Sequence, residues 1–317
     1  MNSKLIELNN KYLIKREQKG INDFSLFNNE KFIDLHKESG RVFYFSLHLI
    51  SDEKCVGVCN FLEKENGELQ SPCAGSYGGF EFVNSINLDI KELFIMKVLK
   101  ALEAECPKTI KIILPPDIYS LGNNSHIISV LHRDGFKVLN IELNQYIDVA
   151  RYEINRFVSH GNRKRIKNCL KNGLSFKRLS QNQYHEAYEV IVKNRKKKSF
   201  PVTMSWEMLS KMSDTFKEKT LFFGIFDGTK IIASAVCLNV KKNILYVFYW
   251  GDLPGYETLS PVALLSYQLT QFAKDNGYDL LDIGTSSVNS LPNLGLYKFK
   301  ENIGCFSCNK IYLHKTF

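Results

Sequence analysis

Near the end of the chain, residues 278–304 read YDLLDIGTSSVNSLPNLGLYKFKENIG. Residues 280–283 predict a short buried strand, and Gly284 opens a loop of small hydroxyl residues. A short helical segment follows, with Lys298 and Lys300 on either side of an aromatic residue. A strand that ends in small polar residues is a usual place for a binding site, because a ligand can come close to it. A strand, a surface loop and a solvated turn explain the same residues equally well, so the rest of the chain must decide.

Length and composition are those of a globular protein with two domains of ordinary size. The chain has 317 residues, of which 44% are apolar and 24% are charged, which is enough to bury substantial cores. It contains no apolar run of about 18 residues, the length that crosses a bilayer, and residues 1–20 lack the apolar core of a signal peptide. The eight cysteines are scattered, and Cys305 and Cys308 form a lone CxxC without a second pair. We therefore expect a cytoplasmic protein with reduced thiols and without a metal site.

The positive charge is concentrated in one block. The net charge is +9, and residues 1–150 carry 17 basic and 20 acidic side chains, whereas residues 151–200 alone carry 14 basic and 3 acidic ones. A concentrated positive charge indicates an anionic partner. The classes that fit are a nucleic acid such as tRNA, a nucleotide or phosphorylated substrate, and a peripheral contact with an anionic membrane surface. Both a monomer and a homodimer fit the sequence.

One order of elements occurs twice: helix, strand, short helix, glycine and strand, each time after a predicted hairpin. The first copy comprises residues 87–105, 109–114, 125–134, Gly135 and 136–143, and the second comprises residues 261–276, 278–283, 292–302, Gly304 and 305–313. Apolar periodicity and flanking Pro or Gly residues define each element. The repeat predicts an α+β protein with two similar domains, 1–150 and 151–317, joined near residues 145–158.

Three helices are predicted in more detail. Residues 24–39 have the apolar spacing of one helix that ends before Gly40. Residues 160–172 predict a basic helix that ends at Gly173. The helix at 87–105 has an apolar stripe, which we place on Leu88, Leu93, Met96, Leu99, Leu102 and Ala104.

Three stretches resemble the Fem-type transferases, a family of tandem domains with the GCN5-related N-acetyltransferase (GNAT) fold. Residues 159–173, SHGNRKRIKNCLKNG, resemble the basic helix of the family. Residues 71–80, SPCAGSYGGF, resemble the glycine-rich segment of its first domain. Residues 278–304 resemble its closing motif, in which Phe-Lys precedes a glycine and the last strand. The resemblance implies two tandem GNAT-like domains, each with a mixed, mostly antiparallel sheet flanked by helices.

The resemblance also implies an enzyme that transfers an acyl or aminoacyl group to an amino group. In the best-known members the donor is an aminoacyl-tRNA and the acceptor is a peptidoglycan precursor, and related members act in polysaccharide, lipid or cofactor pathways. The implied acceptor is a cell-envelope component, a peptidoglycan precursor or an amino sugar. The implied donor is an aminoacyl-tRNA or an acyl-CoA, and we expect no tightly bound cofactor.

Two other functions remain open. One is an acyl-CoA-dependent N-acyltransferase of small-molecule or lipid metabolism, and the other is a non-catalytic RNA-binding protein. Ordinary members of the fold bind coenzyme A with a Gln/Arg-x-x-Gly-x-Gly/Ala loop. That pattern is absent from residues 251–263, GDLPGYETLSPVA.

Carried over to this chain, the resemblance places Lys300 near the reacting carbonyl, where its ammonium would stabilise the developing negative charge. We expect the replacement of Lys300 by Ala to abolish transfer and to leave the melting temperature nearly unchanged. Asp282 and Glu257 are candidate bases, with the capping of a loop and of a helix as their alternatives. Tyr249 is a further candidate for the catalytic site, with core packing as its alternative.

Further residues are candidates for binding the substrate. Lys298 is a cationic candidate in the closing stretch. Ser286 and Ser287 could bind a polar group of the ligand, with a solvated loop as the alternative. Tyr77 and Gly78 could form the wall of a cleft, with a broad turn as the alternative. The basic helix contributes candidates for binding the phosphate of the donor or of a nucleotide-linked acceptor: Arg163, Lys164, Arg165 and Lys167.

Overall fold

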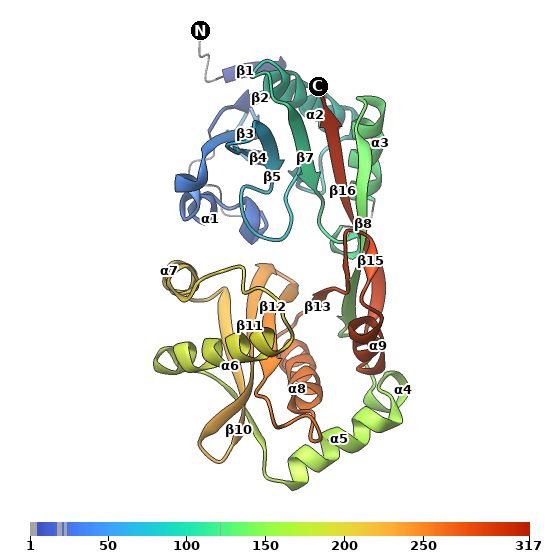
Figure 1. Ribbon diagram of the computed structural model, residues 1–317. Coiled ribbons are helices and arrows are strands. Elements are labelled where there is room, and N and C mark those ends of the chain that lie inside the picture. Colours follow the sequence, from blue (N-terminus) through green and yellow to red (C-terminus); the bar gives the residue numbers. More distant parts are fainter. Residues whose placement is uncertain (1–4, 18–20, 22–23, 121) are drawn as a thin grey trace. The chain divides into compact units, whose positions relative to one another are not determined.

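The computed structural model describes residues 5–17, 21, 24–120 and 122–317 and divides the chain into two compact units (Figure 1). Unit 1 comprises residues 1–142 and 309–317, and unit 2 comprises residues 143–308. The sequence predicted a division at 150/151, with the whole C-terminal strand in the second domain. The difference arises because two long strands, β8 (Lys137–Asp148) and β16 (Phe306–Thr316), each begin in one unit and end in the other.

Unit 1 is built on a sheet with the strand order β1-β2-β3-β4-β5-β7-β16. Strands β5 and β7 run parallel, and the neighbouring pairs run antiparallel. A short strand, β6 (Glu81–Phe82), also pairs with β4. The other strands of this sheet are β1 (Leu5–Asn9), β2 (Tyr12–Lys15), β3 (Arg41–Leu49), β4 (Cys55–Glu63), β5 (Glu68–Ser71) and β7 (Thr109–Ile113).

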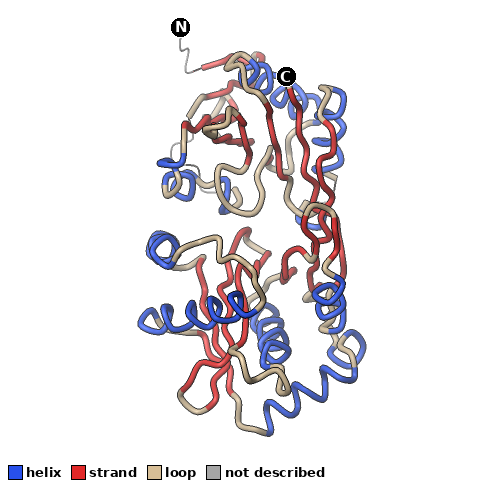
Figure 2. Tube along the Cα trace, viewed as in Figure 1, coloured by secondary structure: helices blue, strands red, loops and turns tan. Residues whose placement is uncertain are grey.

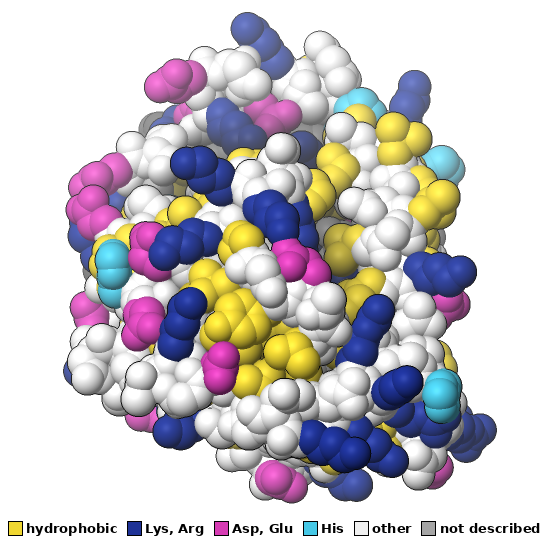
Figure 3. Space-filling view, turned by 60° about the horizontal axis from the view of Figure 1, so that its bottom comes forward, with side chains coloured by type: hydrophobic (Ala, Val, Ile, Leu, Met, Phe, Trp, Pro, Cys, Tyr) yellow, Lys and Arg dark blue, Asp and Glu magenta, His cyan; other side chains and the backbone are white. Residues whose placement is uncertain are grey.

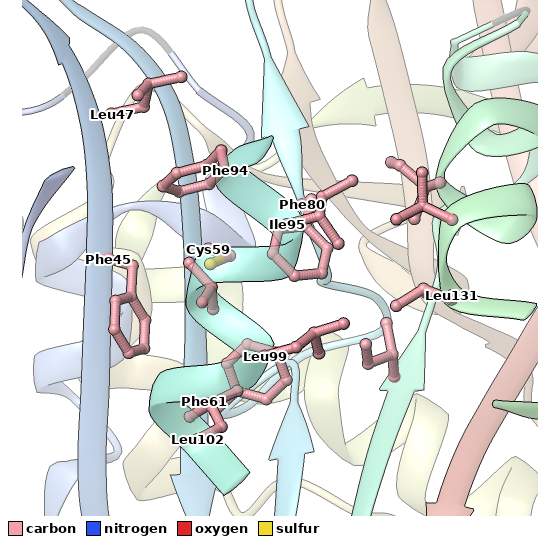
Figure 4. Packing of buried hydrophobic residues seen from close by; sticks show 14 of the residues in the cluster. Phe45, Leu47, Cys59, Phe61, Phe80, Phe94, Ile95, Leu99, Leu102 and Leu131 are labelled. Atoms are coloured by element: carbon pink, nitrogen blue, oxygen red, sulfur yellow. The ribbon is translucent and has the colours of Figure 1, made fainter. Parts of the chain in front are cut away.

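The core of unit 1 lies between this sheet and two helices, α2 (Leu88–Glu103) and α3 (Asn123–Arg133). Figure 4 shows Phe94, Ile95, Leu99 and Leu102 of α2 in one cluster with side chains of β3 and β4, namely Phe45, Leu47, Cys59 and Phe61. The predicted stripe of α2 was wrong at four of its six positions. Leu88, Leu93 and Met96 are 60%, 37% and 41% exposed, and Ala104 is an exposed residue after the end of the helix. The buried stripe instead starts at Ile90 and continues through Phe94 and Val98, because side chains three and four positions apart share one face of a helix.

The single helix predicted at residues 24–39 is also wrong. The chain forms three short pieces there: η1 (Leu26–Asn28), α1 (Glu30–Asp34) and η2 (Lys37–Ser39). Asn29 is extended, with φ −77° and ψ 135°, and its side chain accepts a hydrogen bond from the Lys31 amide. Asn side chains compete in this way with the helical backbone, so one turn ends and the next begins at Asn29. Residues 5–15 form the β1–β2 hairpin, for which no element was predicted, and residues 1–4 and 18–20 lie outside the described residues.

Unit 2 is built on a sheet with the strand order β8-β13-β12-β11-β10-β9. Strands β12 and β13 run parallel, and the other pairs run antiparallel. The strands are β9 (Ser175–Arg178), β10 (Thr220–Asp227), β11 (Lys230–Lys241), β12 (Ile244–Asp252) and β13 (Leu280–Thr285). The helices are α4 (Ile154–Phe157), α5 (His160–Lys171), α6 (Tyr184–Lys197), α7 (Trp206–Thr215), α8 (Pro261–Asp275) and α9 (Leu294–Asn302).

Helices cover both faces of this sheet (Figure 2). Neighbouring residues of β10 show this, because successive side chains of a strand point to opposite faces. The ring of Phe222 stacks on Tyr184 of α6, with 3.9 Å between the centroids. The ring of Phe223 meets Phe272 of α8, with 4.8 Å between the centroids. Two layers of helices therefore enclose β10–β12, which explains their nearly continuous apolar sequences.

The structure contains both copies of the repeated order. The first copy is α2, β7, α3 and β8, and the second is α8, β13, α9 and β16. The glycine before the last strand occupies the same place in both, and φ is +90° at Gly135 and +99° at Gly304. This left-handed backbone favours glycine and ends the helix sharply.

Candidate functional site

A groove of about 630 Å³ lies between α5 and α9 in unit 2. Each helix contributes four residues spaced at i, i+3, i+4 and i+7, which form one helical face. Asn162, a fifth residue of α5, and Ser159, the residue before this helix, complete the lining. The two faces are Gly161, Lys164, Arg165 and Asn168 on α5, and Gly295, Lys298, Phe299 and Asn302 on α9. We refer to this site as the α5–α9 groove.

Hydrogen bonds join the end of α9 to the start of α5. The Asn302 carbonyl accepts from the Ser159 amide at 2.9 Å and from Asn162 Nδ2 at 3.2 Å. Ser159 also caps α5, since its hydroxyl accepts from the Asn162 amide. Asn162 Oδ1 in turn accepts from Arg165 Nη1 at 3.1 Å. The buried Asn162 therefore fixes both the angle between the helices and the position of one guanidinium.

The lining of the groove is cationic. Lys164, Arg165 and Lys298 supply three positive charges, and none of the ten lining residues is acidic. Figure 3 shows Lys and Arg side chains gathered over α5, at the lower right of the view. The first turn of α5 adds the partial positive charge of a helix N-terminus. Such a site attracts an anion, and phosphate suits it best because a guanidinium and two ammonium groups can bind several of its oxygens.

The structure brings only some of the predicted phosphate-binding residues to this groove. Arg165 and Lys298 line it, as does Lys164. Arg163 lies elsewhere on α5, where Nη1 donates to the carbonyl and the side-chain oxygen of Asn155 at 3.1 and 3.3 Å. Lys167 is exposed and does not line the groove.

Lys300 does not face the groove, although its neighbours on α9 do. Its side chain is 2% exposed, and Nζ donates to the carbonyls of Gly284 and Thr285 at 2.8 and 2.9 Å. Burial lowers the pKa of Lys300 to about 8, against smaller opposing effects of Cys305 and Asp282. Lys300 is thus a buried cation that fastens the end of β13. The expectation that its removal leaves stability unchanged does not fit this burial, because two buried carbonyls would lose their donor.

Asp282 forms part of the same buried framework. It is 2% exposed, and Oδ1 accepts from Asn144 Nδ2 at 2.8 Å and from the Gly284 amide at 2.7 Å. Gly284 has φ +78° and lies where the pairing of β13 with β8 shifts register. The carboxylate therefore caps an irregular turn of the strand, which is the alternative that the sequence left open.

The two serines after this turn are also fixed in the structure. Ser286 is 1% exposed, and its hydroxyl donates to Gln145 Oε1 at 2.5 Å. Ser287 is 5% exposed, and its hydroxyl accepts from the Leu143 amide at 2.7 Å. Both hydroxyls hold the loop to β8, so neither belongs to a solvated loop.

Tyr249 lies on the side of the sheet that faces α6. Its ring is 3% exposed, and the Arg195 guanidinium lies 4.7 Å from the ring centroid. Its hydroxyl lies 2.6 Å from Thr203 Oγ1 and accepts from the Met204 amide at 3.1 Å. These contacts tie the loop before α7 to β12. Tyr249 does not line the α5–α9 groove.

Glu257 is an exposed carboxylate that forms an ion pair with Lys197. It also accepts a hydrogen bond from the Gly255 amide at 3.0 Å. The Lys197 hydrogen bond is the largest of the effects that lower the pKa of Glu257 to about 2. A carboxylate with so low a pKa is a poor base at neutral pH.

Tyr77 and Gly78 belong to the packing of unit 1. The Tyr77 ring is 4% exposed and meets Phe27 and Tyr119 edge to face, at centroid distances of 4.9 and 5.3 Å. The Gly78 amide donates to the Ile113 carbonyl at 2.8 Å. A Cβ at Gly78 would lie 2.7 Å from Pro72 Cα, so the close backbone approach requires glycine. A role for these residues in binding a substrate remains a prediction.

Sequence reasoning missed seven of the ten groove residues, namely Ser159, Gly161, Asn162, Asn168, Gly295, Phe299 and Asn302. One signal could have found most of them. Both helices carry Gly-x-x-Lys-Arg/Phe-x-x-Asn, at residues 161–168 and 295–302, which puts the same three residue types on one helical face. Among the described residues, no three His, Cys, Asp or Glu side chains lie together as metal ligands. In that same part of the chain, no helix is long and apolar enough to cross a membrane.

Comparison with known proteins identifies the fold. No protein-family model and no curated protein matches the sequence. Among solved structures, FemX is similar with a TM-score of 0.71 at 14% identity, over 94% of each chain. L-PGS from Bacillus licheniformis, a lysylphosphatidylglycerol synthetase, has a TM-score of 0.62 at 13% identity, over 92% of this chain and 93% of its own.

A tandem GNAT protein from the clavulanic acid biosynthesis pathway has a TM-score of 0.50 at 10% identity, over 92% of this chain and 97% of its own. The chain therefore has the Fem-like tandem GNAT fold, and the predicted α+β class is confirmed.

Proposed function

We propose that this protein is an acyl- or aminoacyltransferase that binds a phosphate-bearing substrate in the α5–α9 groove. The observation that carries the proposal is the groove itself, with Lys164, Arg165 and Lys298 in its lining and no carboxylate. The fold that the chain shares with FemX and a lysylphosphatidylglycerol synthetase supports the reaction class. The acceptor is an amino group of a cell-envelope component, a peptidoglycan precursor or an amino sugar.

The reaction joins an amine nitrogen to the acyl carbon of an ester or thioester. The C–N bond forms, the bond to the leaving oxygen or sulfur breaks, and the amine proton passes to the leaving group or to solvent. Rates of such steps depend strongly on holding the two reactants in the correct orientation. The groove contributes by fixing a phosphate at a set place relative to α9, and Gly161 and Gly295 let the ligand approach both helices closely.

Lys300 acts in this scheme as a positioning residue. Its ammonium holds the carbonyls of Gly284 and Thr285, which precede the loop fixed by Ser286 and Ser287. A direct role in stabilising an oxyanion would require Nζ to exchange one of these carbonyls for the substrate. We place the direct electrostatic contact with substrate on Lys298 instead, because Lys298 faces the groove from the same helix.

Residues 251–263, at the end of β12 and just after it, do not favour coenzyme A as the donor in the binding mode of ordinary acetyltransferases. Asn194 of α6 donates through Nδ2 to the carbonyl and to Oδ1 of Asp252, at 2.9 and 2.7 Å. A Cβ at Gly251 would lie 2.7 Å from Asn194 Cβ, so α6 packs closely on the start of this segment. The missing coenzyme A pattern of residues 251–263 thus coincides with a closely packed strand end. An aminoacyl-tRNA is the donor that fits better.

Calorimetry and a product assay distinguish the donors. Binding of tRNA and of coenzyme A is measured at several salt concentrations, and products from a charged tRNA and from an acyl-CoA are identified by mass spectrometry. We expect tRNA to bind and an aminoacylated amine to form. Replacing Lys164, Arg165 and Lys298 by Gln should reduce the slope of log K against log salt by about 2–3, one for each lost phosphate contact.

A matched control replaces Lys217, Lys242 and Lys274 by Gln, since these exposed lysines of unit 2 do not line the groove. Its salt slope should equal that of the wild type. Tight binding of coenzyme A with product from acyl-CoA would replace the tRNA assignment with the acyl-CoA alternative. Binding of tRNA without product from any charged donor would contradict the enzymatic proposal and favour an RNA-binding protein.

A further inference from the structure

A short hairpin before α9 exposes apolar side chains. Strands β14 (Ser287–Val288) and β15 (Leu291–Pro292) pair so that Val288 lies opposite Leu291. These two side chains are 71% and 74% exposed, and Leu294 at the start of α9 is also 74% exposed. Among the residues that the structure describes, no large apolar side chain is more exposed than these three. We refer to Val288, Leu291 and Leu294 as the apolar tip.

A tight two-residue turn joins the two strands of the apolar tip. Asn289 and Ser290, the two residues between the strands, have φ of +51° and +64°. Two left-handed residues in a two-residue loop are typical of the tight turn that matches the twist of a hairpin. The cross-strand pair Val288–Leu291 is therefore presented by the backbone at the end of the hairpin. Single exposed aliphatic residues are common, but three within seven residues at one tip indicate an apolar partner.

Positive charge adjoins the apolar tip. Leu294 and Lys298 are four residues apart on α9 and so share a face of the helix, and Lys298 lines the α5–α9 groove with Lys164 and Arg165. Beyond the groove, α5 exposes further basic side chains, Lys167 and Lys171, which are spaced i+3 and i+7 from Lys164 and so share a face of the helix with it. One exposed carboxylate, Glu301, lies among them on α9. The surface as a whole is cationic with aliphatic residues that project from it.

We propose that the apolar tip and the basic side chains of α5 form a docking surface for an anionic lipid bilayer. Aliphatic side chains enter the boundary between headgroups and acyl chains, and neighbouring Lys and Arg side chains bind the lipid phosphates. A nucleic acid fits the tip poorly, because unpaired bases stack on aromatic side chains and the tip has none. This docking surface goes beyond the transfer reaction and does not depend on it.

Vesicle co-sedimentation tests the proposal with the full chain. Binding is compared for vesicles of phosphatidylcholine alone and of phosphatidylcholine mixed with phosphatidylglycerol. We expect binding only to the anionic vesicles. The double variant Leu291→Ser/Leu294→Ser should bind them about 100-fold more weakly, at about tenfold for each leucine withdrawn from the apolar phase. Replacing Lys167 and Lys171 by Gln should weaken binding by about fivefold for each lysine.

The matched control is Leu88→Ser/Met96→Ser, which removes two exposed apolar side chains from α2 of unit 1. It should bind vesicles as tightly as the wild type, and the circular dichroism of all variants should stay unchanged. A depth measurement uses Leu291→Trp with brominated lipids, which should quench the added fluorescence, whereas Leu88→Trp should not be quenched.

Equal vesicle binding by wild type and Leu291→Ser/Leu294→Ser would overturn the proposal, and so would equal binding to neutral and anionic vesicles. Vesicle binding without transfer activity would leave the docking surface intact and contradict only the proposed reaction.

Discussion

Replacing Lys300 by Met removes a buried ammonium and keeps a side chain of similar length. In the folded chain the pKa of Lys300 is about 8, and its ordinary value is 10.5. This difference means that carrying the charge in the fold costs about 3 kcal/mol relative to the neutral amine. The variant avoids this cost but leaves the carbonyls of Gly284 and Thr285 without their donor, a loss of about 1.5–3 kcal/mol for each hydrogen bond. We therefore expect a destabilisation of about 0–3 kcal/mol at pH 7.

The pH dependence is the sharper part of this prediction. Between pH 8 and 10.5 the unfolded chain keeps the Lys300 proton and the folded chain has released it. Stability rises with pH wherever the unfolded state binds more protons. The cost of the charge is thus fully present below pH 8 and disappears above pH 10.5, so the wild type should gain about 3 kcal/mol over the variant across this interval.

Urea unfolding followed by tryptophan fluorescence measures the free energy of unfolding of unit 2, which contains Lys300. The two tryptophans of the chain, Trp206 and Trp250, both lie in unit 2. Subtracting the unfolding free energy of the variant from that of the wild type at each pH cancels the other titrating groups. A difference that stays constant from pH 7 to 10.5 would refute the assignment of Lys300 as a buried, desolvated ammonium.

Three further substitutions separate packing from function. Gly161→Ala should stabilise α5 by about 0.5–1 kcal/mol, since nothing lies within 4 Å of the new Cβ. It should also weaken substrate binding by narrowing the α5–α9 groove, as a KM measurement would show. Gly78→Ala should lower the stability of unit 1 by about 1–3 kcal/mol in calorimetric scans, because its Cβ meets the Pro72 backbone. Glu257→Gln should leave the pH profile of transfer unchanged, since the Lys197 ion pair already keeps the carboxylate ionised; loss of the acidic limb, where a base becomes protonated, would identify Glu257 as the general base.

Most helices and strands could be predicted because local chemistry sets their ends. Helix α8 begins at the predicted Pro261, and the β10–β11 hairpin turns at Gly228-Thr229, just after the last strand pair, Asp227 with Lys230. Gly135 and Gly304 both stand between the short helix and the last strand of their copy of the repeat, and both have the left-handed backbone that favours glycine. These signals need no knowledge of distant contacts. Together with the resemblance of three stretches to one family, they were sufficient for the fold.

The site was less predictable because direction and burial depend on tertiary contacts. Lys298 and Lys300 are two residues apart, yet the first lines a groove and the second bonds to the end of β13. The sequence alone does not show which face of α9 meets α5, a helix from a remote part of the chain. Asn162 illustrates the same limit, because its contact with Asn302 defines the groove and has no local signature.

The most direct test of the proposed function is to measure the rate of product formation by variants of the α5–α9 groove. Lys164→Gln/Lys298→Gln is compared with the wild type and with Lys242→Gln/Lys274→Gln, while the concentration of the phosphate-bearing substrate is varied. We expect kcat/KM of the groove variant to fall roughly 10- to 100-fold, mainly through KM, because the removed cations bind the substrate before and during the reaction. The control should keep the wild-type value. A groove variant with wild-type kcat/KM, or a wild-type protein that forms no product from charged tRNA or acyl-CoA, would contradict the proposal.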